Sequence, residues 1–172
     1  MNKNKKFVII NNIVTFLLGF IVHGMYSWFP SFFTSIFPVN ESLYEHVKLV
    51  YLSPILSVII VGLFYHYKIN NIFYGIFISI LFNILFFYIL YLPIYYLLGN
   101  SMIMTLIVYF ISIVASNYIY YLIIQKRYHK NYNILGIVLL IIGIIGLTYL
   151  SYYPPKVDFF KDPENNTYGI KK

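Results

Sequence analysis

Apolar residues in this chain are gathered into runs long enough to cross a lipid bilayer. A membrane-spanning helix needs about 20 mostly apolar residues. Five stretches meet that requirement: Phe7–Trp28, Val47–Tyr67, Ile72–Leu97, Met102–Ile124 and Ile134–Tyr153. The pattern therefore predicts an all-α fold, a polytopic membrane helix bundle with five transmembrane helices.

The boundary between the third and fourth spans follows from an absence of charge. No Asp, Glu, Lys, Arg or His occurs from residue 69 to residue 125. That run is too long for one span and suits two spans joined by a short hairpin. Pro93 and the sequence Gly99-Asn100-Ser101 are the breakers that predict where the first of these helices ends and the next begins.

Composition and the first residues set the expected domain organisation. The chain is 60% hydrophobic and 10% charged, whereas soluble domains carry about 25% charged residues. Cysteine is absent, which excludes disulfides, thiolate metal ligands and Cys nucleophiles. The first span follows lysines, as a secretory signal does, but it is long enough to span and no small-residue cleavage site follows it. We expect residues 1–153 to form one transmembrane domain and residues 154–172 a polar extracytoplasmic tail.

Positive charges predict the orientation of the spans. The more positive side carries Lys3, Lys5, Lys6, Lys68, Lys126, Arg127 and Lys130. By the positive-inside rule this side is cytoplasmic, so the N-terminus lies inside and the C-terminus outside. All five carboxylates fall on the outer side: Glu41, Glu45, Asp158, Asp162 and Glu164. We expect a multi-pass protein of the cell membrane, whose net charge of +7 reflects orientation and membrane lipids rather than nucleic acid.

Polar and small residues recur on one face of several spans, and we expect those faces to pack inside the bundle because polar groups are costly in lipid. The first span carries Asn12, Thr15, Gly19, His23 and Tyr26, the second Ser42, His46, Ser53 and Ser57, and the fourth Thr105, Tyr109, Ser112, Ser116 and Tyr120. The fifth carries Gly136, Gly143 and Gly146, which predict close helix contacts.

Two histidines stand out on these faces. His23 and His46 both lie toward the outer ends of their helices, so the two rings are expected to meet in the mouth of the bundle. A histidine inside a membrane span is a functional candidate. The structural alternative is a neutral imidazole hydrogen-bonded to Tyr or Ser across a helix interface.

The densest chemistry lies in the sequence P-V-N-E-S-L-Y-E-H-V-K at residues 38–48. Asn40 is the predicted N-cap of the second helix, and Glu41 would then lie at the positive end of the helix dipole. Helical spacing places Glu41, Glu45 and Lys48 on one side of this helix. Ser42 and His46 would lie on another side.

Three interpretations of this segment stay open. It is a capped helix end with a solvated charged face, or a site in which His46, His23 and one or two carboxylates bind a divalent ion such as zinc. The third is metal-free acid–base chemistry by a Glu and His pair. Neither H-E-x-x-H nor G-x-S-x-G occurs.

These residues also carry a resemblance. The chain resembles a domain-of-unknown-function family of small bacterial multi-span membrane proteins that share a first-helix His and a P-V-N-E-S-x-x-E-H-x-K block. The shared tail resembles Pro154-Pro155, Phe160-Lys161-Asp162-Pro163 and Tyr168-Gly169-Ile170. Relatives have Trp where this chain has Tyr44. The resemblance implies a multi-span fold and no known activity, with signature positions His23, Asn40, Glu41, Ser42, Glu45 and His46.

The tail after Pro154-Pro155 is polar, with Asp-Pro and Asn-Asn turn chemistry. A frayed terminus is the simplest interpretation, but Phe159 and Phe160 are poorly suited to a free tail. If the tail folds over the outer mouth, it brings Asp158 or Asp162 near the carboxylates and histidine of the second helix.

The leading functional hypothesis is an intramembrane hydrolase with a site at the outer face, either metal-dependent or metal-free, acting on a lipid-linked or peptide substrate. The catalytic candidates are His23, Glu41, Glu45 and His46. The metal-ligand candidates are His23, His46, Glu45, Asp158 and Asp162, with zinc as one divalent ion that suits them. The alternative is a non-catalytic small carrier or a subunit of a membrane complex. Enzyme and binding roles, and the oligomeric state, stay open at this level.

Overall fold

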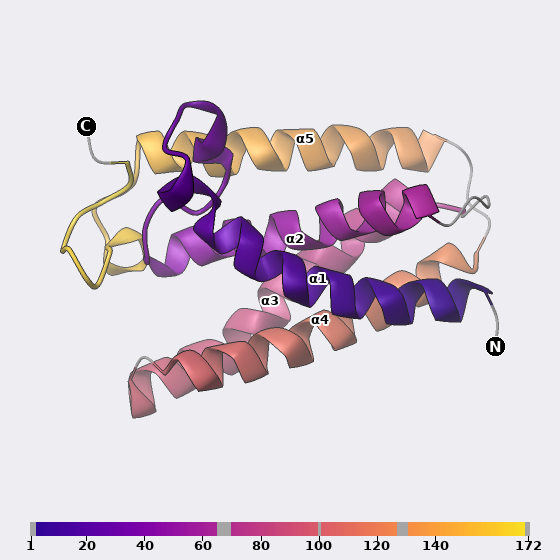
Figure 1. Cartoon of the computed structure of the whole chain (residues 1–172), viewed down its shortest axis with the longest axis horizontal. Helices are drawn as coiled ribbons and strands as arrows, with labels where there is room; N and C mark the ends of the chain where they lie inside the picture. The colour runs from indigo at the N-terminus through magenta and orange to yellow at the C-terminus, as the bar shows by residue number, and fades with distance from the viewer. Residues whose placement is uncertain (1–2, 65–69, 100, 127–130, 171–172) are drawn as a thin grey trace.

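Five long helices make up almost the whole fold. The computed structural model describes residues 3–64, 70–99, 101–126 and 131–170. The helices are α1 (Lys3–Trp28), α2 (Leu43–Phe64), α3 (Ile72–Leu98), α4 (Met102–Ile124) and α5 (Asn131–Tyr152), with the short 3-10 helices η1 (Phe33–Ile36) and η2 (Asp158–Phe160). Successive helices run in opposite directions (Figure 1), so α1 begins at the end of the bundle opposite the C-terminal tail. We call the end that carries the tail the tail end.

All five helices are long and apolar enough to cross a membrane, so the predicted all-α membrane helix bundle is confirmed. The observed bounds differ in two places. α2 begins at Leu43, four residues before the expected Val47. Pro93 lies inside α3 and does not end it; the helix ends at Leu98, before Gly99 with φ +77°. Lys68, Arg127 and Lys130, on which the predicted orientation partly depends, lie outside the described residues.

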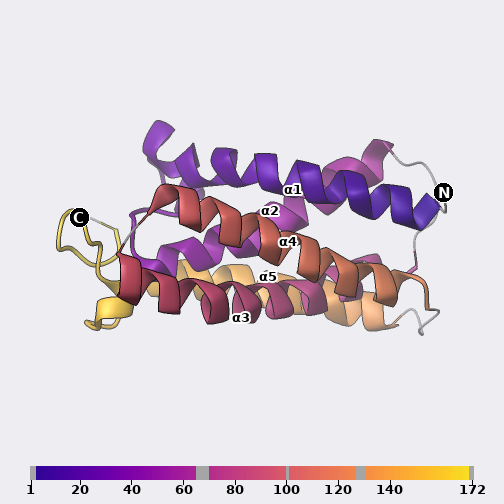
Figure 2. The same cartoon turned by 90° about the horizontal axis from the view of Figure 1, so that it is seen from below.

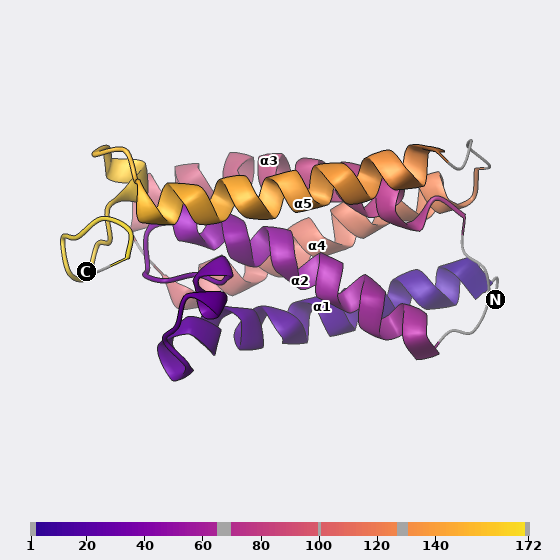
Figure 3. The same ribbon diagram turned by 90° about the horizontal axis from the view of Figure 1, so that it is seen from above.

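The helices pack as a central hairpin with flanking helices. α3 and α4 form that hairpin, α1 packs against both α2 and α4, and α5 packs mainly against α3. Figure 2 shows α4 between α1 and α3, and Figure 3 shows α5 on the outside of the bundle. Only 17% of the most apolar window of α5 is buried, against 61% for α2. α2 is therefore the most buried of the five helices, and α5 presents most of its surface to lipid.

A polar network joins α1, α2 and α4 deep in the bundle. The amide Nδ2 of Asn11 donates to Asn117 Oδ1 at 3.1 Å, Asn117 Nδ2 donates to Asn12 Oδ1 at 2.6 Å, and the Ser57 hydroxyl donates to Asn11 Oδ1 at 2.6 Å. Asn11, Ser57 and Asn117 are fully or almost fully buried. The predicted inward direction is confirmed for Asn12 and Ser57, whereas Asn11 and Asn117 were not on the predicted faces. Buried polar groups need partners that lipid cannot supply.

The three glycines of α5 make unequal contacts. A Cβ added at Gly136 would lie 2.5 Å from the backbone nitrogen of Tyr74, and one at Gly143 would lie 2.0 Å from the hydroxyl of Tyr51. A Cβ at Gly146 would have no neighbour within 4 Å. The predicted close approach is therefore confirmed at Gly136 and Gly143 and wrong at Gly146, because Gly146 lies on a part of α5 that has no helix against it.

The segment between α1 and α2 has both exposed and anchored residues. Phe29, Phe32 and Phe33 are exposed, whereas Ser35 is buried. η1 packs against α5 near the tail end (Figures 1 and 3). Exposed aromatic side chains at a helix end are typical of a segment that lies at the membrane interface.

The tail is folded onto the tail end of the bundle. The ring of Phe160 stacks on that of Tyr44 at 4.3 Å between centroids, and Phe159 packs on Tyr88 at 5.6 Å. Asn40 Nδ2 donates to the carbonyl of Gly169 at 3.0 Å, and the amide of Ile170 donates to the carbonyl of Ser151 at 3.0 Å. These contacts explain why two phenylalanines occur in an otherwise polar tail.

Candidate functional site

Local capping decides which residues of the segment 38–48 are helical. The side chain of Asn40 accepts the amide of Ser42 at 2.9 Å and so closes a turn before the helix. The hydroxyl of Ser42 accepts the amide of Glu45 at 3.3 Å, which is the contact made by an N-cap residue. The predicted N-cap at Asn40 is therefore wrong by two residues, because Asn40 uses its side chain for the turn and leaves the cap to Ser42.

This shift separates two acidic residues that helical spacing had placed together. Glu41 precedes α2, so it does not follow the periodicity of the helix and does not share a face with Glu45 and Lys48. Its side chain instead reaches across to α1. The expectation that these three residues line one side of the helix is wrong for Glu41.

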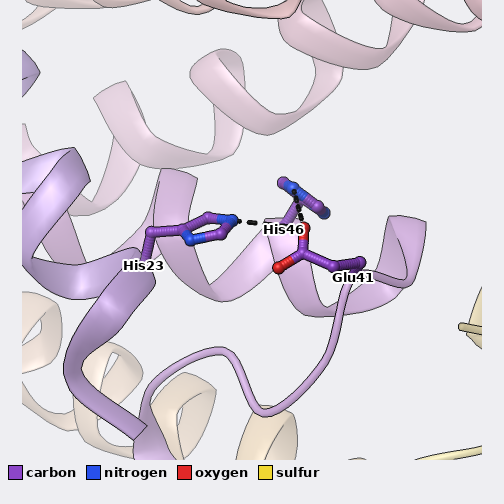
Figure 4. A group of neighbouring side chains, drawn as sticks. All are labelled: His23, Glu41 and His46. Carbon is purple, nitrogen blue, oxygen red and sulfur yellow. Dashed lines mark ion pairs between the residues drawn. The ribbon is translucent and has the colours of Figure 1, made fainter. Parts of the chain in front are cut away.

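Glu41 lies between the two histidines (Figure 4). Its Oε2 is 3.3 Å from His23 Nε2 and 3.8 Å from His46 Nε2. The two imidazole centroids are 5.5 Å apart, so the predicted meeting of the rings is confirmed. One ligand atom from each of the three residues lies within 4.8 Å of the other two. The structure thus joins α1, the loop before α2 and the first turn of α2 in one cluster, which we call the His-Glu-His cluster.

The ring of His46 is oriented by the backbone. His46 Nδ1 lies 2.9 Å from the carbonyl oxygen of Ser42. A carbonyl only accepts, so Nδ1 carries the hydrogen and donates it. In the neutral ring this leaves a lone pair on Nε2, the nitrogen that faces Glu41. A histidine held by an Nδ1–H to carbonyl bond, with Nε2 free, is the usual arrangement of a metal-ligating imidazole.

The carboxyl group of Glu41 is electrostatically tuned by its neighbours. The hydrogen bond with His23 and the charges of both imidazoles hold the pKa of Glu41 below its ordinary value, against the opposing effect of partial burial. Glu41 is therefore anionic at neutral pH. The side chains of Glu41 and His23 are each 39% exposed, so the cluster is open to an incoming ion or substrate.

Glu45 and Lys48 form a second, closed cluster. Lys48 Nζ lies 2.9 Å from Glu45 Oε2, with side-chain exposures of 0% and 1%. Glu45 also accepts the amide of Val39 at 3.1 Å and the hydroxyl of Ser151 at 2.5 Å. Lys48 also donates to the carbonyls of Ser35 and Phe37. The carboxylate of Glu45 is thus engaged on both oxygens, and the structure does not bring it to the His-Glu-His cluster.

The cluster lies at the rim of a cavity of about 800 Å³ between α1, α2, α3, α4 and the tail. Gly19 and Tyr109 are at its floor, where a Cβ on Gly19 would lie 2.7 Å from the Tyr109 ring. The walls are mainly aromatic and apolar, and the tail supplies a polar roof. The wall residues of α3 and α4 are Phe87, Tyr91, Tyr95, Tyr96, Met102, Thr105 and Leu106.

The two candidate aspartates of the tail differ in position. Asp158 is exposed and lines the cavity together with His23, Glu41 and His46. Asp162 is buried, and its carboxylate accepts the amide of Glu164 at 3.0 Å and the side-chain amide of Asn165 at 2.9 Å. Asp162 therefore organises the turn of the tail, and the cavity lining among the described residues includes Asp158 but not Asp162.

Sequence reasoning missed the wall of the cavity. Tyrosines near the ends of a span are typical of anchors at the membrane interface, yet Tyr91, Tyr95 and Tyr96 all line the cavity. The spacing of Tyr91 and Tyr95 by one helical turn was the available signal. This signal was weak, because α3 is apolar apart from Ser79, Asn83 and its tyrosines, and tyrosine is also typical of the membrane interface.

The fold and the site together define a class: a multi-span membrane protein of five helices with a His/Glu/His group that could hold a metal ion. The chain belongs to DUF6512, a family of unknown function whose sequence pattern matches residues 1–170. This agrees with the resemblance drawn from the block at residues 38–48. No curated protein and no solved structure matches the chain.

Proposed function

We propose that this protein is a divalent-metal-dependent hydrolase whose metal ligands are His23, Glu41 and His46. The observation that carries the proposal is the convergence of their three ligand atoms within 4.8 Å at the rim of the cavity. Zinc bonds nitrogen and oxygen at about 2.0–2.2 Å, so tetrahedral ligands lie about 3.3–3.6 Å apart. The distances of 3.3 Å and 3.8 Å to Glu41 Oε2 are near that spacing.

The ligand set favours catalysis over a purely structural metal. Catalytic zinc sites keep three protein ligands and leave a fourth position for water, and two His with one Glu is a common set. The three residues line the cavity, so an ion held by them would be accessible from it. Such an ion would lower the pKa of a bound water and polarise a carbonyl or phosphoryl oxygen of the substrate. In the hydrolysis the OH of water would go to the acyl or phosphoryl group, and the remaining proton to the leaving oxygen or nitrogen.

The remaining cavity residues have simpler roles in this proposal. Asp158 lines the cavity without belonging to the ligand group, so it is the candidate to accept a proton from water. Glu45 and Lys48 help to position Glu41, because Lys48 donates to two backbone carbonyls of the segment that leads to Glu41. We propose the cell membrane as the location, with the cavity open to the outer face, in keeping with the positive-inside rule.

The test is the metal content of detergent-purified protein, measured by mass spectrometry after incubation with zinc and removal of free ions. We expect near-stoichiometric metal in the wild type, and its loss in the His23→Ala, His46→Ala double variant and in Glu41→Gln. Glu164→Gln is the matched control, because it removes a carboxylate on the same cavity wall outside the ligand group.

Folding is checked on the same samples by thermal unfolding. Zinc at about 100 times its Kd stabilises a protein that binds it by about 2.7 kcal/mol, and this increment is expected in the wild type and absent in the double variant. Folded wild type that holds no metal after zinc addition overturns the metal centre. Metal-bound protein that cleaves none of the esters, phosphodiesters or peptides screened in membranes overturns the hydrolase and favours the carrier or subunit role.

A further inference from the structure

The cavity extends below the His-Glu-His cluster, by about one helical turn to Gly19 on α1 and Val50 on α2, into the membrane-spanning part of the bundle. Along α3 its lining runs from Tyr96 to Phe87, and along α4 from Met102 to Tyr109. Nine residues of α-helix rise about 13 Å. Half of the hydrocarbon core of a bilayer is about 15 Å. The depth of the cavity is therefore close to the thickness of one leaflet. A water-soluble substrate that binds at the rim does not require such depth.

The lining changes character with depth. At the mouth are the His-Glu-His cluster and the polar groups of the tail, including Asp158 and Lys161. Below them the walls are formed by residues such as Phe87, Leu106 and Val50. This order, polar at the membrane surface and apolar below, is the order of groups in a membrane lipid.

The cavity also has a side that faces lipid. Phe20 of α1 and Met102 of α4 both line it, and they are 45% and 73% exposed. Figure 1 shows α1 and α4 crossing near the middle of the bundle and diverging toward the tail end. A chain lying in the bilayer can thus reach the cavity sideways between these helices without leaving the apolar phase.

We infer that the substrate is a membrane lipid, whose acyl or isoprenyl chain lies in the deep part of the cavity and whose head group lies at the His-Glu-His cluster. The claim that this lipid is the substrate rests on the proposed hydrolase. The claim that a lipid chain occupies the cavity does not depend on it. A peptide substrate is disfavoured, because the deep walls offer few partners for backbone amides and carbonyls beyond the hydroxyls of Tyr91, Thr105 and Tyr109.

The experiment is photolabelling of the full chain in nanodiscs with a phospholipid that carries a diazirine on one acyl chain. Phe87 and Tyr109 are only 2% and 4% exposed, so lipid around the bundle cannot reach them. Labelling of peptides at these two residues is expected in the wild type. It is expected to be lost in Leu106→Trp, which fills the cavity, and retained in the neighbouring Ile107→Trp, whose parent side chain is 48% exposed.

Metal content is measured on the same nanodisc samples, so the two proposals fail separately. Metal present without label at Phe87 or Tyr109 overturns the lipid inference and leaves the metal centre standing. Equal labelling in Leu106→Trp and wild type also overturns it, because the label then does not come from the cavity. Labelling that follows the expected pattern in protein without metal supports the lipid site and overturns the proposed metal chemistry.

Discussion

The ammonium group of Lys48 lies 2.9 Å from the carboxylate of Glu45, and both side chains are shielded from solvent. Through this pair α2 holds two neighbouring segments. Lys48 binds the carbonyls of Ser35 and Phe37, and Glu45 binds Ser151 of α5. A buried ion pair stabilises little by itself, but each charge depends on the other once both are out of water.

Removing one partner of this pair is expected to be costly. Lys48→Met leaves the Glu45 carboxylate buried without its counter-ion, which destabilises a fold by about 3–5 kcal/mol. Thermal unfolding in detergent measures the loss. Adding Glu45→Gln to Lys48→Met should recover part of it, because the double variant has no unpaired buried charge. Lys156→Met, at an exposed position, is the control, and an equal effect there would contradict the prediction.

The glycines of α5 provide a matched pair on one helix. Gly136→Ala forces a methyl group against the backbone of Tyr74, which cannot move as a flexible side chain can. We expect it to separate α5 from α3 and to cost about 1–3 kcal/mol. Gly146→Ala meets nothing within 4 Å and should be neutral or slightly stabilising. Similar unfolding midpoints for the two variants would show that the α3–α5 contact is not tight at Gly136.

The fold of the tail predicts resistance to proteolysis. Chymotrypsin should cut the wild type slowly at Phe159 and Phe160, because both rings are packed on the bundle. Phe160→Ala removes the stack on Tyr44, and such pairs contribute about 0.5–1.5 kcal/mol, so cleavage at Phe159 should be several-fold faster. Val157→Ala, at a side chain that is 53% exposed, serves as the control. Rapid cleavage of the wild-type tail would show that it is not held against the bundle.

Glu41 predicts a defined pH dependence of stability. Its pKa in the folded protein is below the ordinary value of 4.5, so the unfolded chain binds a proton more readily. The stabilisation is complete above about pH 4.5 and is lost as the pH falls through the lowered pKa. Because the side chain is 39% exposed, solvent screening limits the contribution to less than about 1 kcal/mol.

The measurement is the difference in unfolding free energy between the wild type and Glu41→Gln, without added metal, across this range. The difference should shrink in acid, as the pH falls below about 4.5. Glu164→Gln, at an exposed position, should show no such change. A difference that increases as the pH falls would have the wrong sign for a carboxylate of lowered pKa.

The sequence by itself determined the membrane class and the five helices. A run of about 20 apolar residues has few alternatives to a helix in lipid, because every backbone polar group must be bonded within the segment. The meeting of His23 and His46 was also predictable, since each lies on the polar face of its helix and near the same end. These inferences depend on the periodicity of the polar residues and on the free-energy cost of placing polar groups in lipid. Both can be evaluated from the sequence.

Local capping and tertiary contacts, rather than helical spacing, decided that Glu41 and Glu45 belong to different clusters. Both are acidic residues of one short block, and an uninterrupted helix would have placed them on one side. Because Asn40 closes a turn and Ser42 caps the helix, the helical periodicity begins only after Glu41. Glu41 then meets His23, while Glu45 meets Ser151, which is distant in sequence. The cavity wall was decided in the same way, because an apolar helix does not show which of its faces meets another helix and which meets lipid.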